Sequence, residues 1–307
     1  MKSRAAATAV AIGCAVVVAG CGLGAGKGTS DVTLTVSRDF GTSAVASTAE
    51  PNVPGSETVM RMLERSARVT TRYGGGFVES IDGLSGNSAR RDWFYYVNGI
   101  EAVAGAAETA VHRGDRIWWD LHDWTVTESI PAVVGSYPEP FLHGIAGKRL
   151  PTALECGGRD AAACRTVTAA LSALGVPSAT QLLGTGSGTD SLTVDVGTWA
   201  ELRPQIVADV IEKGPSLSGV YARFNPAGSA ILLLDPRGRV VASLGPGAGL
   251  IAATASHGFA PTWLVTGTDP QGVQAAARAL TVARLRNRFA LAVQGGRDFP
   301  LPLEGST

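Results

Sequence analysis

The sequence predicts a mixed α+β protein built in two parts, and three observations support this. The 307 residues are 45% hydrophobic, which is enough for two ordinary cores. Residues 31–127 follow the order strand, helix and then several strands, and seven of the chain's nineteen aromatic residues fall between Trp93 and Trp124. Residues 130–294 contain fewer aromatic residues, and their helical and strand patterns alternate. Residues 295–307 are left as a tail.

The N-terminus has the pattern of an export signal. Lys2 and Arg4 precede an apolar stretch, Ala5 to Gly20, that is too short to remain as a spanning helix. Val18-Ala19-Gly20-Cys21 resembles the lipobox of bacterial lipoproteins, in which the cysteine is acylated and becomes the new N-terminus. We therefore expect a signal peptide at 1–20, lipidation at Cys21 and a flexible linker at 21–30, with the protein held on the outer face of the plasma membrane. The alternatives are an uncleaved anchor and an ordinary signal peptide.

The first predicted part begins with an alternating strand at Val32–Val36. A polar stretch follows, and Ser56-Glu57-Thr58 then opens a helix with Val59, Met62 and Leu63 on one face. This helix is expected to pack on the sheet by its apolar face. Phe77 to Ile81 is a short predicted strand.

Two aromatic strands come next. In the first, Trp93 and Tyr95 alternate with Phe94 and Tyr96, and Asn98-Gly99 provides a strong turn signal. In the second strand, Ile117, Trp119 and Leu121 alternate with Trp118, Asp120 and His122. A sheet of several strands crossed by one helix is the arrangement of β-grasp folds.

These motifs carry a resemblance to a known family. Trp93-Phe94-Tyr95-Tyr96-Val97-Asn98-Gly99, followed after an insert by Gly114-Asp115-Arg116-Ile117-Trp118-Trp119, resembles a bacterial β-grasp family of unknown function related to the small C-terminal domain of transcobalamin and intrinsic factor. The resemblance covers about a third of the chain. In the vitamin carriers this domain closes over cobalamin bound on a helical barrel, for which this sequence has no counterpart. The resemblance implies a β-grasp fold and a role in binding or covering a ligand, such as a cobalamin-like molecule.

The aromatic strands supply the candidate ligand-binding residues. One face of the sheet must pack on the helix, and Trp93, Tyr95, Ile117 and Trp119 are assigned to it. Tyr96, Trp118 and Trp124 would then lie on the other face, where an exposed aromatic row is typical of a contact surface. The alternative is that this row packs against the protein's own second part. The complete set of candidates is Trp93, Tyr95, Tyr96, Asn98, Trp118, Trp119 and Trp124.

The second part is predicted to be a three-layer α/β domain with at least one antiparallel strand pair. Its predicted helices begin at Asp160, at the capping box Thr198–Glu201, with a break at Pro204, and at Asp269-Pro270. Its predicted strands are Leu192–Val196, Val220–Phe224, Ile231–Leu234, Val240–Leu244, Pro261–Thr266 and Phe289–Val293. Asp235-Pro236-Arg237-Gly238 is a tight turn between two of these strands.

Two glycine-containing segments have weak functional patterns. Gly247-x-Gly249-x-x-Ala252 fits a loose dinucleotide fingerprint if a helix starts there, although a plain turn is the commoner origin of such a run. Thr266-Gly267-Thr268-Asp269 stands at a helix start, where free amides hold anions or a side chain simply caps the helix.

Cys156 and Cys164 are the two cysteines left after the signal peptide and the lipidated residue are set aside. Outside the cytoplasm we expect them to form a disulfide that fixes a loop to the first turn of a helix. Metal binding is the rival explanation, but no histidine lies near them.

Composition and motifs argue against several function classes. The 26 basic residues balance the 26 acidic ones, and no basic run exceeds Arg90-Arg91, so nucleic acid is not an expected partner. The sequence has no Gly-x-Ser-x-Gly motif, and its four histidines lack metal-ligand spacing. We expect no enzyme activity, no metal and no cofactor. The sequence favours a cell-surface lipoprotein that binds a small, cobalamin-like ligand or a partner protein, with a structural envelope component as the alternative.

Overall fold

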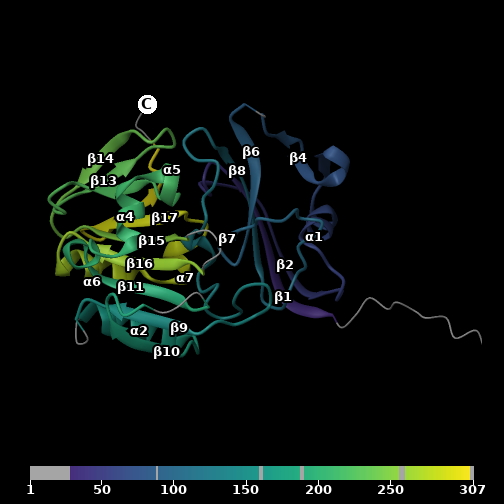
Figure 1. The fold of residues 1–307 in the computed structure, drawn as a ribbon. Helices are drawn as coiled ribbons and strands as arrows, with labels where there is room; N and C mark the ends of the chain where they lie inside the picture. The colour runs from purple at the N-terminus through teal and green to yellow at the C-terminus, as the bar shows by residue number, and fades with distance from the viewer. Residues whose placement is uncertain (1–27, 88, 159–161, 187–189, 256–259, 305–307) are drawn as a thin grey trace, which may run out of the picture.

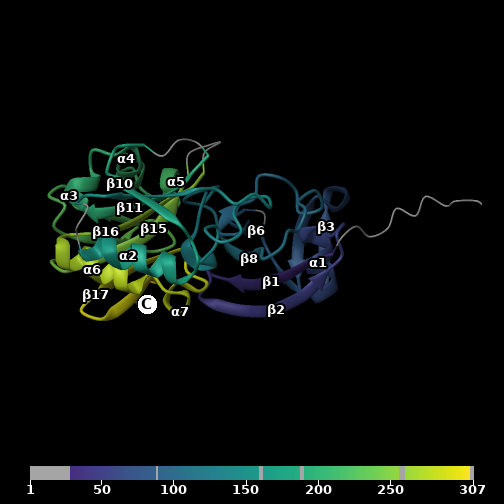
Figure 2. The same ribbon diagram turned by 90° about the horizontal axis from the view of Figure 1, so that it is seen from below.

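The computed structural model describes residues 28–87, 89–158, 162–186, 190–255 and 260–304. The signal peptide, Cys21 and most of the linker therefore lie outside the described residues. Two large sheets dominate the rest, and the earlier and later halves of the chain lie side by side in both views (Figures 1 and 2). At this level the protein is a mixed α+β structure, as the sequence predicts. Within the described ranges, no helix combines the length and the apolar character needed to cross a bilayer.

The N-terminal sheet has five strands in the order β2-β1-β8-β6-β7. β1 and β8 run parallel, and the other neighbours are antiparallel. The predicted strand at 32–36 and both aromatic strands are confirmed. The sequence prediction missed β2, an edge strand whose half-exposed small residues carry little apolar signal. The strands are β1 (Thr29–Arg38), β2 (Ser43–Val53), β6 (Arg91–Val97), β7 (Ile100–Glu101) and β8 (Arg116–Asp123).

Helix α1 (Val59–Ser66) covers one face of this sheet. Thr58 caps it by accepting a hydrogen bond from the Arg61 backbone amide. The predicted apolar face is confirmed, because Val59, Met62 and Leu63 are fully buried in the core that also contains Trp93, Tyr95 and Trp119. A small antiparallel sheet of β3 (Val69–Arg72), β4 (Phe77–Ile81) and β5 (Leu84–Ser85) lies beside this core, with a 3-10 turn, η1 (Tyr73–Gly75), between β3 and β4.

The C-terminal sheet has seven strands in the order β10-β9-β11-β16-β15-β17-β18. The first four are parallel, and the antiparallel pairing begins at β16 and β15. Both β9 and β10 were missed by sequence analysis, whereas β11 and β16 are confirmed. The strands are β9 (Thr152–Cys156), β10 (Ser178–Leu182), β11 (Leu192–Thr198), β15 (Gly249–Thr254), β16 (Thr262–Gly267), β17 (Ala290–Gln294) and β18 (Arg297–Leu301).

Other elements cover both faces of the C-terminal sheet. Helices α2 (Ala162–Ala173) and α6 (Pro270–Ala279) pack on one face, and α6 begins at the predicted cap, Asp269. The other face carries α3 (Trp199–Leu202), α4 (Ile206–Glu212), α5 (Pro215–Ser218) and a three-stranded sheet of β12 (Ala222–Phe224), β13 (Ile231–Leu234) and β14 (Val240–Leu244). The capping box at Thr198 and the break at Pro204 are confirmed. Two short elements, η2 (Val134–Ser136) and α7 (Val282–Leu285), lie near β17.

One prediction in this part of the chain is wrong, one weak pattern is not borne out, and one prediction lies outside the described residues. Gly249–Thr254 is a fully buried strand instead of the start of a helix, so the segment cannot offer the helix N-terminus that a dinucleotide site requires. Residues 297–301, predicted as tail, form the edge strand β18. The helix cap predicted at Asp160 falls on a residue that the structure does not describe.

The predicted disulfide is confirmed. Cys156 ends β9 and Cys164 lies in the first turn of α2, with 6.1 Å between their Cα atoms. Both cysteines are buried in the core under α2. The bridge therefore fixes the start of this helix to the sheet.

Candidate functional site

The aromatic row formed by Tyr96 and Trp118 lies between the two large sheets. Both side chains are almost completely buried. Phe289, which precedes β17, packs its ring edge-on against both of them, at centroid distances of 5.6 Å from Tyr96 and 5.1 Å from Trp118. The side chains alternate between the two faces of the sheet as predicted, but the face opposite α1 is covered by the C-terminal half of the chain. These two candidates are therefore corrected from ligand contacts to interior packing.

A buried polar network completes this contact between the sheets. The carboxylate of Asp120 accepts hydrogen bonds from the Phe40 and Gly41 amides at 3.0 and 2.8 Å and from the Ser37 hydroxyl at 2.5 Å. His122 Nδ1 lies 3.0 Å from the same carboxylate, and its ring stacks on Phe40. Serine, aspartate and histidine come together here, but all three side chains are shielded from solvent, and their hydrogen bonds hold the turn after β1.

Asn98 is the third candidate that the structure places away from an open surface. It is buried in the turn after β6 in the left-handed backbone region, with φ at 56°. Its amide nitrogen donates to Asp115 and to the Gly144 carbonyl, and its amide oxygen accepts from the Arg116 backbone. These bonds use its side chain to hold the turn, so its prediction as a ligand contact is also corrected.

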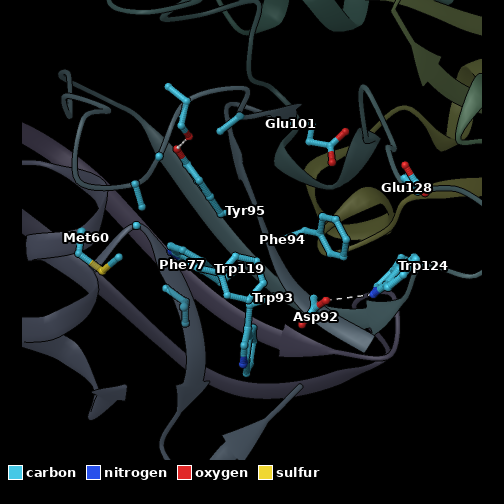
Figure 3. A pocket seen from close by; sticks show the side chains of 16 residues that line it. Met60, Phe77, Asp92, Trp93, Phe94, Tyr95, Glu101, Trp119, Trp124 and Glu128 are labelled. Carbon is cyan, nitrogen blue, oxygen red and sulfur yellow. Dashed lines mark hydrogen bonds between the residues drawn. The ribbon is translucent and has the colours of Figure 1, made fainter. Parts of the chain in front are cut away.

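The other four candidates line one pocket beside β6 (Figure 3). It has a volume of about 390 Å³, near the lower end of the usual range for small-molecule sites. Aromatic rings dominate its walls, three carboxylates reach it, and no described lining residue is Lys, Arg or His. The side chains that define it are the aromatic residues Phe77, Trp93, Phe94, Tyr95, Trp119 and Trp124, the carboxylates Asp92, Glu101 and Glu128, and Met60.

The pocket lies at an open part of the β6 edge. The Asn98 amide donates to Arg116 at the start of β8, and the Arg90 carbonyl accepts from Trp124 just after its end. By antiparallel alternation, the peptide groups of Arg91, Trp93 and Tyr95 therefore point away from β8. Those of Arg91 bond to Asn87, and the Tyr95 carbonyl accepts from the Ala102 amide. Among the described residues, the peptide N–H and C=O of Trp93 have no partner on that side. A polar group entering the pocket would therefore meet an unpaired peptide donor and acceptor.

Hydrogen bonds hold three of the aromatic side chains. Trp93 Nε1 donates to the Leu84 carbonyl at 3.1 Å, and the Tyr95 hydroxyl lies 2.6 Å from the Ala104 carbonyl. Trp124 Nε1 donates to Asp92 at 3.0 Å. Trp119 stacks on Tyr95, but its buried Nε1 finds no acceptor among the described residues. These bonds fix the orientation of three rings, and one indole donor has no partner among the described residues.

The electrostatics of the pocket are acidic. Burial raises the pKa of Asp92, although the hydrogen bond from Trp124 opposes this shift. Burial likewise raises the pKa of Glu101, which accepts a hydrogen bond from the Ser129 hydroxyl. Glu128 is exposed at the rim. Since burial weakens their solvation and no basic side chain is among the described lining residues, these carboxylates favour a cation or a hydrogen-bond donor in the pocket.

Sequence reasoning found four of the pocket residues and missed the others. Asp92, Glu101 and Glu128 lie in three separate segments, and the short pairing of β7 with β6 brings Glu101 to the open edge. Phe77 comes from the small sheet and is 38% exposed. The one sequence feature that pointed to an acidic pocket was Asp92, an acidic residue directly before a run of aromatic residues.

A known family model, described as a domain of unknown function (DUF4430), matches residues 56–123, less than a quarter of the chain. This match includes α1, β6 and β8 and most of the pocket. Among curated proteins, none matches the chain.

Two solved structures resemble part of the chain. Haptocorrin in complex with Cbi matches 32% of this chain with 16% identity and a TM-score of 0.26, and this chain spans only 25% of the haptocorrin chain. A protein from Ruminococcus gnavus ATCC 29149, titled a putative metal binding protein, matches 31% of this chain and 97% of its own, with 15% identity and a TM-score of 0.24. Similarities this low carry no argument about ligand or mechanism.

Proposed function

We propose that this chain is a non-catalytic binding protein whose ligand enters the pocket at the open edge of β6. The observation that carries the proposal is the composition of that pocket: six aromatic side chains and three carboxylates, with no basic side chain among its described lining residues. Aromatic faces attract organic cations, most strongly where water is excluded, and nearby carboxylates add to this attraction. The ligand class is therefore a small organic cation, or a larger molecule that presents such a group.

The wider setting is part of the same proposal. The pocket would belong to the β-grasp domain that the sequence motifs imply. The whole chain would be a lipoprotein, held by Cys21 on the outer face of the plasma membrane. A cobalamin-like ligand fits this proposal only if it extends out of the pocket, because about 390 Å³ encloses a small molecule or one group of a large one. The proposal includes no metal and no cofactor.

Calorimetric titration of the full chain with choline tests the cationic ligand class. The control is 3,3-dimethylbutan-1-ol, which has the same shape without the charge. We expect choline to bind at least ten times more tightly than the neutral alcohol, and Asp92→Asn to weaken choline selectively. Asp82→Asn, an exposed carboxylate outside the pocket, is the matched control. Equal binding of the two probes would refute the cationic ligand, and titration with cobinamide then asks whether a corrinoid binds instead.

A second candidate is a structural or partner-binding component of the cell envelope. It is favoured by the burial of Tyr96 and Trp118 against Phe289, which uses one aromatic face of the sheet for internal packing. Under this alternative the β6 pocket has no small ligand. Absence of heat with choline, cobinamide and the neutral alcohol would support it over the first proposal.

A further inference from the structure

A second cavity lies on the C-terminal sheet, between the sheet and α4. It has a volume of about 530 Å³, within the range of small-molecule sites. Its floor carries Glu155 on β9, Asp195 on β11 and threonines from β11, β15 and β16. Its wall is aliphatic and comes from Ile206, Val207 and Val210 of α4. The cavity shares no lining residue with the pocket at β6.

Glu155 and Asp195 form a pair of adjacent buried carboxylates. They are direct partners across the parallel strands β9 and β11, so their side chains leave the same face of the sheet. Each residue is only 4% exposed. Such a pair is expensive to bury when neither carboxylate has a cation beside it.

The two carboxylates differ in their partners. Both oxygens of Glu155 are occupied, one by the Gln181 side-chain amide at 3.0 Å and the other by the Gly184 backbone amide at 2.9 Å. Asp195 Oδ1 is buried and has no hydrogen-bond partner among the described residues. Asp195 lines the cavity, so a hydrogen-bond donor that enters beside this carboxylate would satisfy its unpaired oxygen.

The charge in the cavity defines what would satisfy that acceptor. None of its described lining residues is Lys, Arg or His, so these residues supply no positive charge to the carboxylates. A metal ion would need more ligands, and the described residues contain no group of three His, Cys, Asp or Glu side chains able to hold one. An anion would be repelled. A positively charged N–H donor with an apolar body matches both the acidic floor and the aliphatic wall.

We propose that this cavity binds a small aliphatic amine, with its ammonium group donating to Asp195 Oδ1 and its hydrocarbon part packed on Val207 and Val210. Charge-assisted hydrogen bonds of this kind are among the strongest in proteins, and exclusion of water strengthens them further. The threonine hydroxyls and the Gln205 amide line the remainder of the floor and rim. The site is independent of the proposed ligand at β6.

The ionisation of Asp195 agrees with this assignment. Burial and the neighbouring Glu155 raise the pKa of Asp195 to about 7. An ammonium group would favour the charged carboxylate and lower this pKa again. Binding near neutral pH should therefore release a proton, and this release is a signature that adsorption to an apolar surface would not give.

The test is calorimetric titration of the full chain with n-hexylammonium at pH 7, with 1-hexanol as the neutral control. We expect the amine to bind at least ten times more tightly than the alcohol, and its heat to depend on the buffer because a proton is released. Asp195→Asn should weaken amine binding at least tenfold and remove the buffer dependence. Asp209→Asn, an exposed carboxylate of α4, is the matched control and should change neither.

Two further variants keep the test decisive. Ile206 is 81% exposed, so Ile206→Lys should fold and place a competing ammonium at the cavity wall, weakening the amine at least fivefold. Trp124→Leu, in the β6 pocket, should leave the proton-releasing, buffer-dependent part of hexylammonium binding unchanged, which separates this site from that one. Equal binding of amine and alcohol, or amine binding that is lost with Trp124→Leu and kept with Asp195→Asn, would overturn the proposal.

Discussion

Asp195→Asn should change the pH dependence of stability in a direction set by the burial of this carboxylate. Burial and Glu155 raise the pKa of Asp195 from 3.8 to about 7. The folded protein therefore keeps a proton that the unfolded chain releases between these two pH values. Because the unfolded state binds fewer protons there, the free energy of unfolding falls as pH rises from about 4 to about 7 and is level above it.

The size of the effect follows from the size of the shift. Each pKa unit corresponds to about 1.4 kcal/mol, so a change of about three units costs the folded protein about 4 kcal/mol above pH 7. About 3 kcal/mol of that loss accumulates between pH 5 and pH 8. Asparagine carries no charge at either pH. The stability of Asp195→Asn relative to the natural chain should thus be higher at pH 8 than at pH 5 by about 3 kcal/mol.

Urea unfolding at the two pH values measures this difference, because the linear extrapolation gives each free energy of unfolding. The difference is taken within each protein, which cancels any general effect of the substitution. Glu155 is the other titratable side chain among the described residues lining the cavity, and it is present in both proteins. Asp209→Asn, whose carboxylate is 60% exposed, should show the pH dependence of the natural chain. Identical pH dependence in Asp195→Asn and the natural chain would refute the account of this acid pair.

Three other predictions concern the architecture. Phe289→Ala should lower the free energy of unfolding by about 3–5 kcal/mol, because Phe289 is 3% exposed and packs on Trp118. It should also shift tryptophan emission to longer wavelength, and an unchanged urea midpoint would contradict this packing. Replacing Cys156 and Cys164 together by serine should lower the free energy of unfolding by about 2–3 kcal/mol, which is the loop entropy of a bridge between residues eight apart. Urea unfolding measures this loss, and equal stability of the natural chain with and without reductant would contradict it. Cys21→Ala should release the protein from membranes into the medium, as followed by fractionation, and continued retention would refute Cys21 as the sole anchor.

Local patterns predicted the elements better than their surroundings. The alternation of Trp93 and Tyr95 with Phe94 and Tyr96 assigned each ring to the correct face, because side chains leave a strand on alternate sides. It could not show which face stays open. That depends on Phe289, which lies nearly two hundred residues after Tyr96 and packs on it only in the folded chain.

The candidate sites were predicted less completely for the same reason. The β6 pocket requires β7 to pair with only the last two residues of β6, a register that no local pattern specifies. Asp195 appeared in the sequence only as the polar member of an alternating strand, where an exposed position would be the ordinary expectation. Its burial follows from the placement of α4 over the sheet, and its partner Glu155 lies on a strand that sequence analysis missed.

The most direct test of the β6 pocket uses the six indole N–H resonances in a proton–nitrogen correlation spectrum during titration with choline. Three of the tryptophans, Trp93, Trp119 and Trp124, line the pocket. Trp118 is buried between the sheets, and Trp199 and Trp263 lie in the cores of the C-terminal half. We expect the first three resonances to shift with one binding curve while the other three stay fixed, and 3,3-dimethylbutan-1-ol to cause much smaller shifts at the same concentration. Shifts confined to Trp118, Trp199 and Trp263, or no shift with any probe including cobinamide, would contradict a ligand at the edge of β6.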